Sequence, residues 1–443
     1  PQSVAQLSLP APTALGLTPT RSSRSDRMRP ARRSLDARSQ MLAEPRERPV
    51  LRPLAALAMP ADVALPERDR NWDHTPYQSR VGEAKVRAIE EHGGSTDTER
   101  AVEAGLEYLA SIRSPQGFWG SADDKHEKYG HVAVGKTGLC MLAFLGAGHT
   151  PGSETEYSRL TREAVDFLLT VQDEDSGHFG YSSSYSHAVA TYALAECFAL
   201  THSERLRKPL EAAVAHILSQ QERSSDRRFH GGWGYYYPDD REFDRWPRVS
   251  VSVWQVMALE SARIGGLSVP DRAFEDAHSF LLSAWDTRHD AFRYSHDPAR
   301  LRSNWPILPG STPAALFALS LLGDDTSSRS FGAARAFVLE RAPHRYQPAS
   351  DDDFVLRARG NLYFWYYGTL ALFRVGGAPW KEWNQAMKGT LLPAQDDDGS
   401  WVPISTYADY AGDSDRDRSY TTAMCVLSLE VYYRYFTPLL KIE

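Results

Sequence analysis

The feature that most constrains this chain is a short turn between two helical segments, which recurs along the sequence. Its clearest copy, residues 395–401, reads Gln-Asp-Asp-Asp-Gly-Ser-Trp and separates an amphipathic segment from an apolar one. Gly399 can take the positive φ that ends a helix, and the indole of Trp401 can then fold back over the neighbouring hairpin. The repeating unit is therefore helix, glycine turn, helix.

Weaker copies of the turn stand upstream. Gly117 and Gly177 are 60 residues apart, and Gly177 and Gly232 are 55 apart, which is room for two helices and their loops. A repeat of this length indicates a helical array rather than a sheet protein. The copies are residues 113–119, without the leading glutamine; 172–179; Gln220 and Gln221 before Gly231-Gly232-Trp233; 285–294, with Asp290 in place of glycine; and a barely legible one near 339–346.

Hydrophobic periodicity divides the segments into two kinds. Segments that precede a turn are amphipathic and are predicted to be outer helices with one face in water, whereas segments that follow a turn are apolar or small nearly all round and are predicted to be inner helices. The expected outer helices are 98–112, 157–171, 204–220, 271–284, 327–341 and 380–392. The expected inner helices are 131–145, 185–200, 249–264, 312–322, 362–375 and 420–435.

Six such pairs with short alternating connections predict an all-α fold, an (α/α)6 toroid of six inner and six outer helices. Each glycine turn would join the C-terminus of an outer helix to the N-terminus of an inner one. All inner N-termini and the longer loops would then lie at one end of the ring, the mouth. Any functional site is expected there.

Composition sets the limits of this domain. The chain has 443 residues, 42% of them hydrophobic, so it can bury a large core as one toroid over residues 98–443. Residues 1–75, rich in Pro, Arg and Ser without a period, are predicted to be a disordered basic tail, and 76–97 a lead-in helix and linker. Residues 1–60 carry ten arginines and four acids, which leaves −13 on the rest and argues against nucleic-acid binding by the folded body.

The cysteines and the apolar runs bear on the cellular compartment of the protein. Cys140, Cys197 and Cys425 all lie in apolar helical segments and are predicted to be buried thiols rather than a disulfide framework. No apolar run approaches the length of a transmembrane helix. The basic tail could contact an anionic membrane peripherally, although a solvated linker is the preferred interpretation. The chain starts at Pro1 rather than methionine, so we expect that a leader was removed or that the N-terminus was trimmed. Whether the protein is exported stays open.

The turn pattern gives this chain a family likeness. Gln-x3-Gly-x-Trp at the end of an outer helix is the mark of the prenyltransferase and squalene-cyclase repeat superfamily, which residues 98–436 resemble. The likeness is strongest to its uncharacterised bacterial single-toroid branch, through segments such as 366–373 and 420–424. The resemblance implies a terpene cyclase-like α/α toroid and, if the protein is active, an isomerase or transferase. Fold alone does not fix the chemistry.

The resemblance fails at the residues that carry catalysis in the family. Its cyclases protonate an alkene with Asp-x-Asp-Asp, which this sequence lacks, and the acidic runs 413–417 and 351–353 are predicted to be solvated loops. Its protein prenyltransferases bind zinc with an aspartate two residues before a cysteine. Here Gly138, Ala195 and Ala423 stand at those positions, so no metal and no other cofactor is expected.

Aromatic and polar residues gather where the mouth is expected. Aromatic faces give contact area at little entropic cost, so these residues could hold an apolar, isoprenoid-like ligand. Hairpin packing is the alternative role for each ring, and a histidine there could simply satisfy a loop carbonyl. The candidate catalytic residues are Asp239, Asp240 and His187. The candidate binding residues are His131, Tyr185, Trp233, Tyr235, Arg248, Trp254, Trp305, Tyr363, Trp365, Tyr366 and Tyr420, with Tyr407 and Tyr410 in the same set.

The sequence is compatible with three functions. The first is an enzyme, or a degenerate enzyme, of the isoprenoid cyclase and prenyltransferase class with a small apolar ligand at the mouth. The second is a non-catalytic toroid that binds a lipid, a glycan or a partner segment. The third is a carbohydrate-cleaving toroid, which needs two carboxylates facing each other across the mouth.

Overall fold

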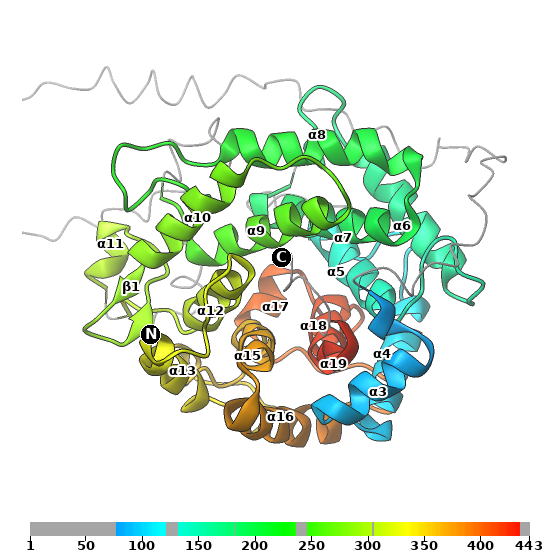
Figure 1. Ribbon diagram of the computed structural model, residues 1–443. Helices are drawn as coiled ribbons and strands as arrows, with labels where there is room; N and C mark the ends of the chain where they lie inside the picture. Colours follow the sequence, from blue (N-terminus) through cyan, green and yellow to red (C-terminus); the bar gives the residue numbers. More distant parts are fainter. Residues whose placement is uncertain (1–76, 121–131, 181, 236–245, 304, 435–443) are drawn as a thin grey trace, which may run out of the picture.

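The computed structural model describes residues 77–120, 132–180, 182–235, 246–303 and 305–434. Within this part the chain forms a closed, two-layered ring of helices, so the predicted (α/α)6 toroid is confirmed (Figure 1). The tail predicted to be disordered, residues 1–75, lies outside the described residues, and that prediction stays untested.

The inner layer is a ring in which each helix packs against the next. The last inner helix, α18, packs against the first, α5, and this contact closes the ring. Ala190, Ala193 and Ala195 of α7 are fully buried, as expected of a helix covered on all sides. The inner helices are α5 (Val132–Gly146), α7 (Ser184–Thr201), α9 (Val249–Ile264), α12 (Ser311–Leu321), α15 (Leu362–Val375) and α18 (Ser419–Leu429).

The outer layer surrounds this ring. Its helices are amphipathic: α6, for instance, buries Leu160, Ala164 and Leu168 and turns Arg159 to solvent. Two short helices, α14 (Asp351–Leu356) and α17 (Thr406–Tyr410), are added in the longer loops, as is α11 (Pro298–Leu301). The outer helices are α4 (Thr96–Ser111), α6 (Ser158–Val171), α8 (Glu204–Gln220), α10 (Asp271–Ser283), α13 (Gly332–Leu339) and α16 (Gly377–Leu391).

The turn tryptophans fasten each outer helix to the turn that follows it. Three indole N–H groups donate to a carbonyl oxygen near the end of the preceding outer helix, and all three side chains are almost fully buried. The N–H group thus keeps its hydrogen bond while the ring fills space between hairpins. The bonds are Trp119 to Leu109 (2.7 Å), Trp233 to Ile217 (2.9 Å) and Trp401 to Leu391 (2.9 Å).

The glutamine and glycine of the turn dock it onto the outer helix of the next repeat. The Gln395 amide donates to the Gly399 carbonyl of its own turn at 2.9 Å and to Ala101 of α4 at 2.8 Å. Gly399 has φ +84°, and a Cβ on it would overlap the Ala104 carbonyl oxygen. Only glycine allows this conformation and this approach. The last turn therefore sits on the first outer helix, and the outer layer closes as well.

The fourth repeat keeps the turn without its glycine. Two short antiparallel strands, β1 (Trp285–Asp286) and β2 (Ala291–Phe292), form a hairpin in which Asp290 has φ +50°. Aspartate tolerates this left-handed conformation better than most residues. Asp290 thus stands where glycine would, as its position in the repeat indicates.

The fifth repeat and the chain end depart from the predicted boundaries. Helix α13 spans only eight residues after a single 3-10 turn at Arg329–Phe331, whereas a helix over 327–341 was predicted. The last inner helix, predicted to reach 435, is interrupted at Glu430 and resumes as α19 (Val431–Arg434). Both predictions extended a periodic pattern past the end of the helix, where sequence periodicity is least informative.

The lead-in segment covers the end of the ring opposite the mouth. It comprises a 3-10 turn, Gln78–Arg80, and α3 (Gly82–His92), and both pack against α19. Arg80 is fully buried and donates to the Leu145 carbonyl at the end of α5 at 3.2 Å. A cation near the last carbonyls of a helix is favourable. Chain segments from both ends of the described part thus meet here.

Candidate functional site

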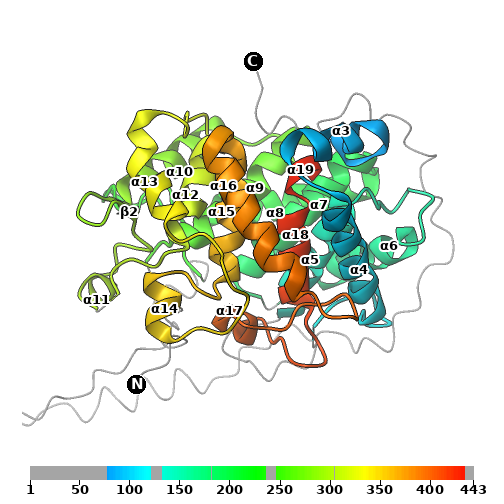
Figure 2. The same ribbon diagram turned by 90° about the horizontal axis from the view of Figure 1, so that it is seen from below.

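The N-terminal ends of the inner helices meet at one end of the toroid. Figure 2 shows α11, α14 and α17 gathered at that end, below the main body of the ring. These elements lie in the long loops that replace or follow the short glycine turns. The end of the ring predicted to be the mouth is therefore the end that carries the irregular structure.

A cavity of about 190 Å³ lies at this mouth. We call it the mouth cavity. Every inner helix contributes residues at or just before its first turns, and α17 covers one side. Most of the lining is aromatic or aliphatic. It comprises Val132, Gly135, Lys136, Leu139, Ser183, Tyr185, Ser186, Val189, Tyr235, Ser250, Trp254, Tyr294, Leu308, Gly310, Ser311, Tyr363, Tyr407, Tyr410, Ala411, Tyr420 and Met424.

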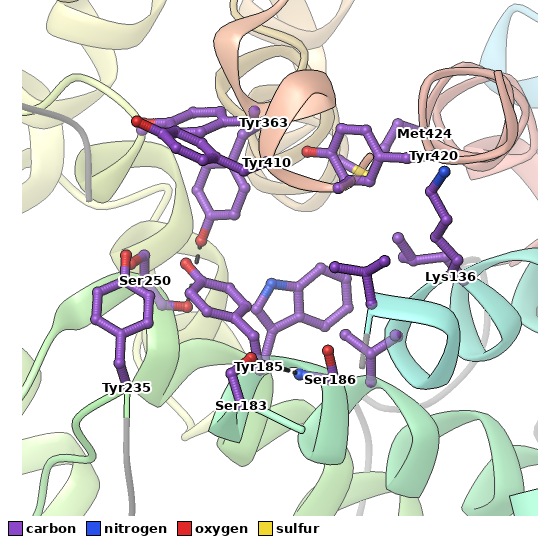
Figure 3. Close-up of a pocket in the computed structure, with 18 of the residues that line it drawn as sticks. Lys136, Ser183, Tyr185, Ser186, Tyr235, Ser250, Tyr363, Tyr410, Tyr420 and Met424 are labelled. Carbon is purple, nitrogen blue, oxygen red and sulfur yellow. Dashed lines mark hydrogen bonds between the residues drawn. The ribbon is translucent and has the colours of Figure 1, made fainter. Parts of the chain in front are cut away.

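Tyrosines face each other across the mouth cavity. Figure 3 shows Tyr363 and Tyr410 on one side and Tyr185 with Ser183 on the other. The Tyr363 hydroxyl donates to the Ser250 carbonyl at 3.3 Å. Burial raises the pKa of the Tyr185 and Tyr363 phenols well above the ordinary value. They are neutral hydrogen-bonding groups at physiological pH.

A second tyrosine pair lies beside two buried arginines. The hydroxyls of Tyr235 and Tyr294 are hydrogen-bonded to each other. The Arg248 guanidinium lies 5.8 Å and 5.6 Å from these two ring centroids, and Arg300 lies 5.8 Å from that of Tyr294. Such positions over ring faces are stabilising for a cation. Arg248 therefore supports the wall of the cavity from behind and does not line it.

A buried ion cluster bounds the cavity at α5 and α18. The Lys136 ammonium lies 2.8 Å from Asp413 and 2.9 Å from Asp417, and the side chains of Lys136 and Asp413 are almost fully buried. Burial would lower the pKa of Lys136, but the two carboxylates outweigh it and raise that pKa. Asp413 also accepts hydrogen bonds from the Tyr420 and Thr421 backbone N–H groups at the start of α18.

The burial of Asp413 corrects a prediction. The run 413–417 was predicted to be a solvated loop, yet the Asp413 side chain is fully buried, and burial raises the pKa of its carboxyl despite Lys136. The run 351–353 begins helix α14, where Asp353 is 29% exposed and paired with two arginines. The sequence pattern missed Asp413 because its partner, Lys136, lies far away along the chain.

The structure brings part of the predicted site together. Five predicted binding residues line the mouth cavity, and so do Tyr407 and Tyr410. The five are Tyr185, Tyr235, Trp254, Tyr363 and Tyr420. His131, Asp239 and Asp240 lie outside the described residues, and their predicted roles stay untested.

Four other predicted binding residues lie away from the cavity. The indole of Trp233 belongs to a turn and bonds to Ile217. Tyr366 is stacked behind Trp254, with ring centroids 6.0 Å apart, and Trp305 packs against the core. Trp365 lines a separate groove on the outer side of α15. Each ring thus has a packing role at the place where the structure puts it.

His187 occupies a fully buried position among other imidazoles. Its Nδ1 accepts from the Phe179 N–H at 3.3 Å, and its Nε2 lies 3.2 Å from the Ala213 carbonyl. The rings of His178 and His216 are 4.7 Å and 5.0 Å away. Burial, and then these two neighbours, lower the pKa of His187 well below its ordinary value. It is a neutral imidazole that joins a turn to α8, and it does not line the mouth cavity.

Several residues that line the mouth cavity were not identified from the sequence. Lys136 is the one charged residue in the otherwise apolar segment 132–146, and that isolation is a signal that could have found it. Tyr294 and Met424 carry no comparable signal. Tyr294 ends the degraded fourth turn, and Met424 is one apolar residue among many in α18.

Two further structural findings concern metals and membranes. In the described ranges, no three His, Cys, Asp or Glu side chains are grouped so that they could hold a metal ion. All three cysteines are buried and unpaired, as predicted. Over the same part of the chain, no helix combines the length and apolar character needed to cross a bilayer.

Comparisons with known proteins support the fold. No family model and no curated protein matches the sequence. Among solved structures, the type II terpene cyclase MstE from Scytonema is 16% identical, with a TM-score of 0.52 over 76% of this chain and 98% of that chain. The same cyclase with geranylgeranyl dihydroxybenzoate, its substrate, gives 0.51. An inactive variant of the α-1,6-mannanase GH76A of Salegentibacter sp. HEL1_6 with mannotetrose is 10% identical, with a TM-score of 0.53 over 77% and 100% of the two chains.

Proposed function

We propose that this protein binds a small apolar molecule of isoprenoid type in the mouth cavity. The observation that carries the proposal is the cavity lining, in which tyrosines, Trp254 and aliphatic side chains surround the space at the inner-helix N-termini. Rings of this kind give a large apolar contact area with little loss of side-chain entropy. The terpene cyclase of the same fold holds a geranylgeranyl compound, which favours this ligand class.

The size and charge of the cavity narrow the ligand. An apolar cavity of about 150 Å³ accepts a benzene-sized molecule, so a cavity of about 190 Å³ suits one ring or the end of a prenyl chain. The charge of Lys136 is offset by Asp413 and Asp417. The hydroxyls of Tyr235 and Tyr294 bind each other, and that of Tyr363 binds the Ser250 carbonyl. The expected ligand is therefore neutral and mostly hydrocarbon.

Catalysis is not needed for this proposal. The sequence lacks the Asp-x-Asp-Asp acid of the cyclases, and the buried Asp413 is held by Lys136 and two backbone N–H groups. In an enzymatic version, Asp239 and Asp240 would supply the acid at the mouth. The non-catalytic alternative is a toroid that captures such a ligand without converting it.

Titration calorimetry with geraniol and farnesol tests the binding. We expect saturable binding that Ser186→Phe weakens by at least about tenfold, because the added ring enters the cavity. Ser186 lines the cavity and is only half-buried, so the variant should fold. Ser219→Phe, at an exposed site on α8, is the matched control and should bind like the unmodified protein. Absence of binding, or equal binding by Ser186→Phe, would refute the proposal.

A glycan is the second candidate, because an α-1,6-mannanase shares the toroid and binds mannotetrose. Tyrosine rings can also stack on sugars. The lining is mostly aromatic and aliphatic, which favours the apolar ligand over a sugar. The same titration with mannotetrose separates the isoprenoid proposal from the glycan proposal. If the protein binds mannotetrose but neither geraniol nor farnesol, and Ser186→Phe abolishes that binding, the glycan is favoured.

A further inference from the structure

The fifth repeat lacks the turn found in the others, and a groove of about 460 Å³ opens there. It lies between the end of α13 and the segment that follows α14. No turn tryptophan stands at this place. The lining comprises Leu339, Glu340, Arg341, Ala342, Pro343, His344, Leu356, Arg357, Ala358, Arg359 and Trp365. We call it the arginine groove.

Arg341 forms part of the wall of the arginine groove at the end of α13. Its Nη1 donates to the Phe337 carbonyl at 2.9 Å, and its Nε donates to the Leu356 carbonyl at 3.0 Å. The guanidinium carbon lies 3.7 Å from the centroid of the Phe337 ring. These bonds fix the guanidinium plane at the groove wall, and Nη2 donates to none of the described groups.

Two more arginines are held on the opposite wall by one carboxylate. Asp353 lies 2.8 Å from Arg357 and 3.3 Å from Arg359, and their side chains are 64% and 38% exposed. Ala358 between them is fully buried with φ +53°, a left-handed conformation that alanine rarely adopts. Three guanidinium groups therefore face Glu340 and Asp353, and the groove keeps a net positive charge.

Trp365 adds a buried donor without an acceptor. Its side chain lines the groove and is 2% exposed, and its Nε1 makes no hydrogen bond to any described group. A buried N–H that lacks a partner costs free energy. An acceptor oxygen supplied by a ligand would remove that cost.

We propose that the arginine groove binds the phosphate group of a small molecule, at a site distinct from the mouth cavity. A phosphate presents several acceptor oxygens in different directions, which suits donors on two walls and at the base. A carboxylate presents two oxygens along one edge and would leave at least one wall unused. The two sites use opposite sides of α15, since Tyr363 lines the mouth cavity and Trp365 the arginine groove.

The probe for this site is inorganic phosphate. Sodium chloride at equal ionic strength and acetate are the reference anions. Titration calorimetry on the full chain should show saturable phosphate binding that neither chloride nor acetate reproduces. The double variant Arg357→Gln/Arg359→Gln should weaken it by at least about tenfold. Both side chains are partly exposed, so folding should persist. Arg100→Gln, an exposed arginine paired with Asp97 on α4, is the matched control and should bind normally.

Asp353→Asn should change the affinity for phosphate in the opposite direction. Because Asp353 competes with a ligand for Arg357 and Arg359, its neutralisation should tighten phosphate binding by about threefold. Ser186→Phe should leave phosphate binding unchanged, which separates this site from the mouth cavity. Equal responses to phosphate and acetate, or unchanged affinity in the double arginine variant, would overturn the proposal.

Discussion

Gly399 and Trp401 show how two residues set the geometry of a repeat. Gly399 lets the chain approach the backbone of α4 at a positive φ, and Trp401 then closes the space between the hairpins with its N–H bonded to Leu391. The Trp401 backbone N–H in turn lies 3.4 Å from the Thr422 hydroxyl on α18. One residue therefore contacts the outer helix before it and the inner helix after it.

Truncation of this indole should be among the costliest changes in the chain. Trp401 is fully buried, so Trp401→Ala should lower the free energy of unfolding by about 3–5 kcal/mol through lost contacts and a cavity. Urea denaturation followed by circular dichroism measures the change. Val402→Ala, at the next residue, is the control; its side chain is 40% exposed, and its loss should cost less than about 0.5 kcal/mol. Similar costs for the two variants would contradict the packing role of the indole.

Among the elements of the fold, the segment 402–418 is held across the mouth by an ion cluster, and an ion pair of Arg418 with Asp396 adds to it. This segment contains α17, which supplies Tyr407 and Tyr410 to the mouth cavity. Lys136 on α5 holds its far end through Asp413 and Asp417, and Asp413 joins it to the start of α18. The shape of the cavity therefore depends on a contact between the first inner helix and the loop that leads into the last one.

Removal of the Lys136 charge should loosen that segment. Lys136→Met leaves the Asp413 carboxylate buried without its cation, which should cost about 3–5 kcal/mol. Hydrogen exchange should show faster exchange of amides in residues 406–418 than in α8. The double variant Lys136→Met/Asp413→Asn should recover part of the loss, because no buried charge remains. Unchanged exchange in the single variant would show that other contacts hold the segment.

In the molecule as a whole, a charge cluster at the end opposite the mouth joins the lead-in segment and α19 to the ring. Glu196 of α7 is 2.8 Å from Arg80 of the lead-in segment and 2.8 Å from Arg434 of α19. Burial would raise the pKa of Glu196, but the two guanidinium groups outweigh it and hold that pKa below its ordinary value. Both ends of the described chain are thus joined to the second inner helix.

Glu196→Gln should therefore destabilise the toroid as a unit. Arg80 would lose its carboxylate, and Arg434 would keep only Glu430, 3.9 Å away, at a cost of about 3–5 kcal/mol. Thermal unfolding followed by calorimetry should show one transition at a lower temperature. Glu204→Gln, on a 76% exposed side chain of α8 paired with Arg207, should shift the transition little. A local loss of helix α3 with an unchanged main transition would argue that the lead-in segment is not part of the cooperative fold.

The layers of the fold could be predicted from the sequence. The inner helices 249–264 and 362–375 coincide with α9 and α15, and the outer helix 204–220 coincides with α8. The Gln-x3-Gly-x-Trp turns placed the connections and the mouth. These features depend on hydrophobic periodicity and turn chemistry, which are local properties of the chain. The boundaries failed in the fifth repeat, where α13 is short and no turn signal marks its end.

Which mouth residues form a site depends on the packing of the inner helices and could not be predicted from the sequence. Tyr363, Trp365 and Tyr366 stand within four positions on α15, yet they face the mouth cavity, the arginine groove and Trp254. An inner helix is covered on all sides, so its pattern does not tell one buried face from another. Lys136 meets Asp417 from 281 residues away, because ring closure brings α5 to α18. Periodicity reports whether a side chain is buried, whereas its partner depends on contacts between distant segments, which local sequence does not encode.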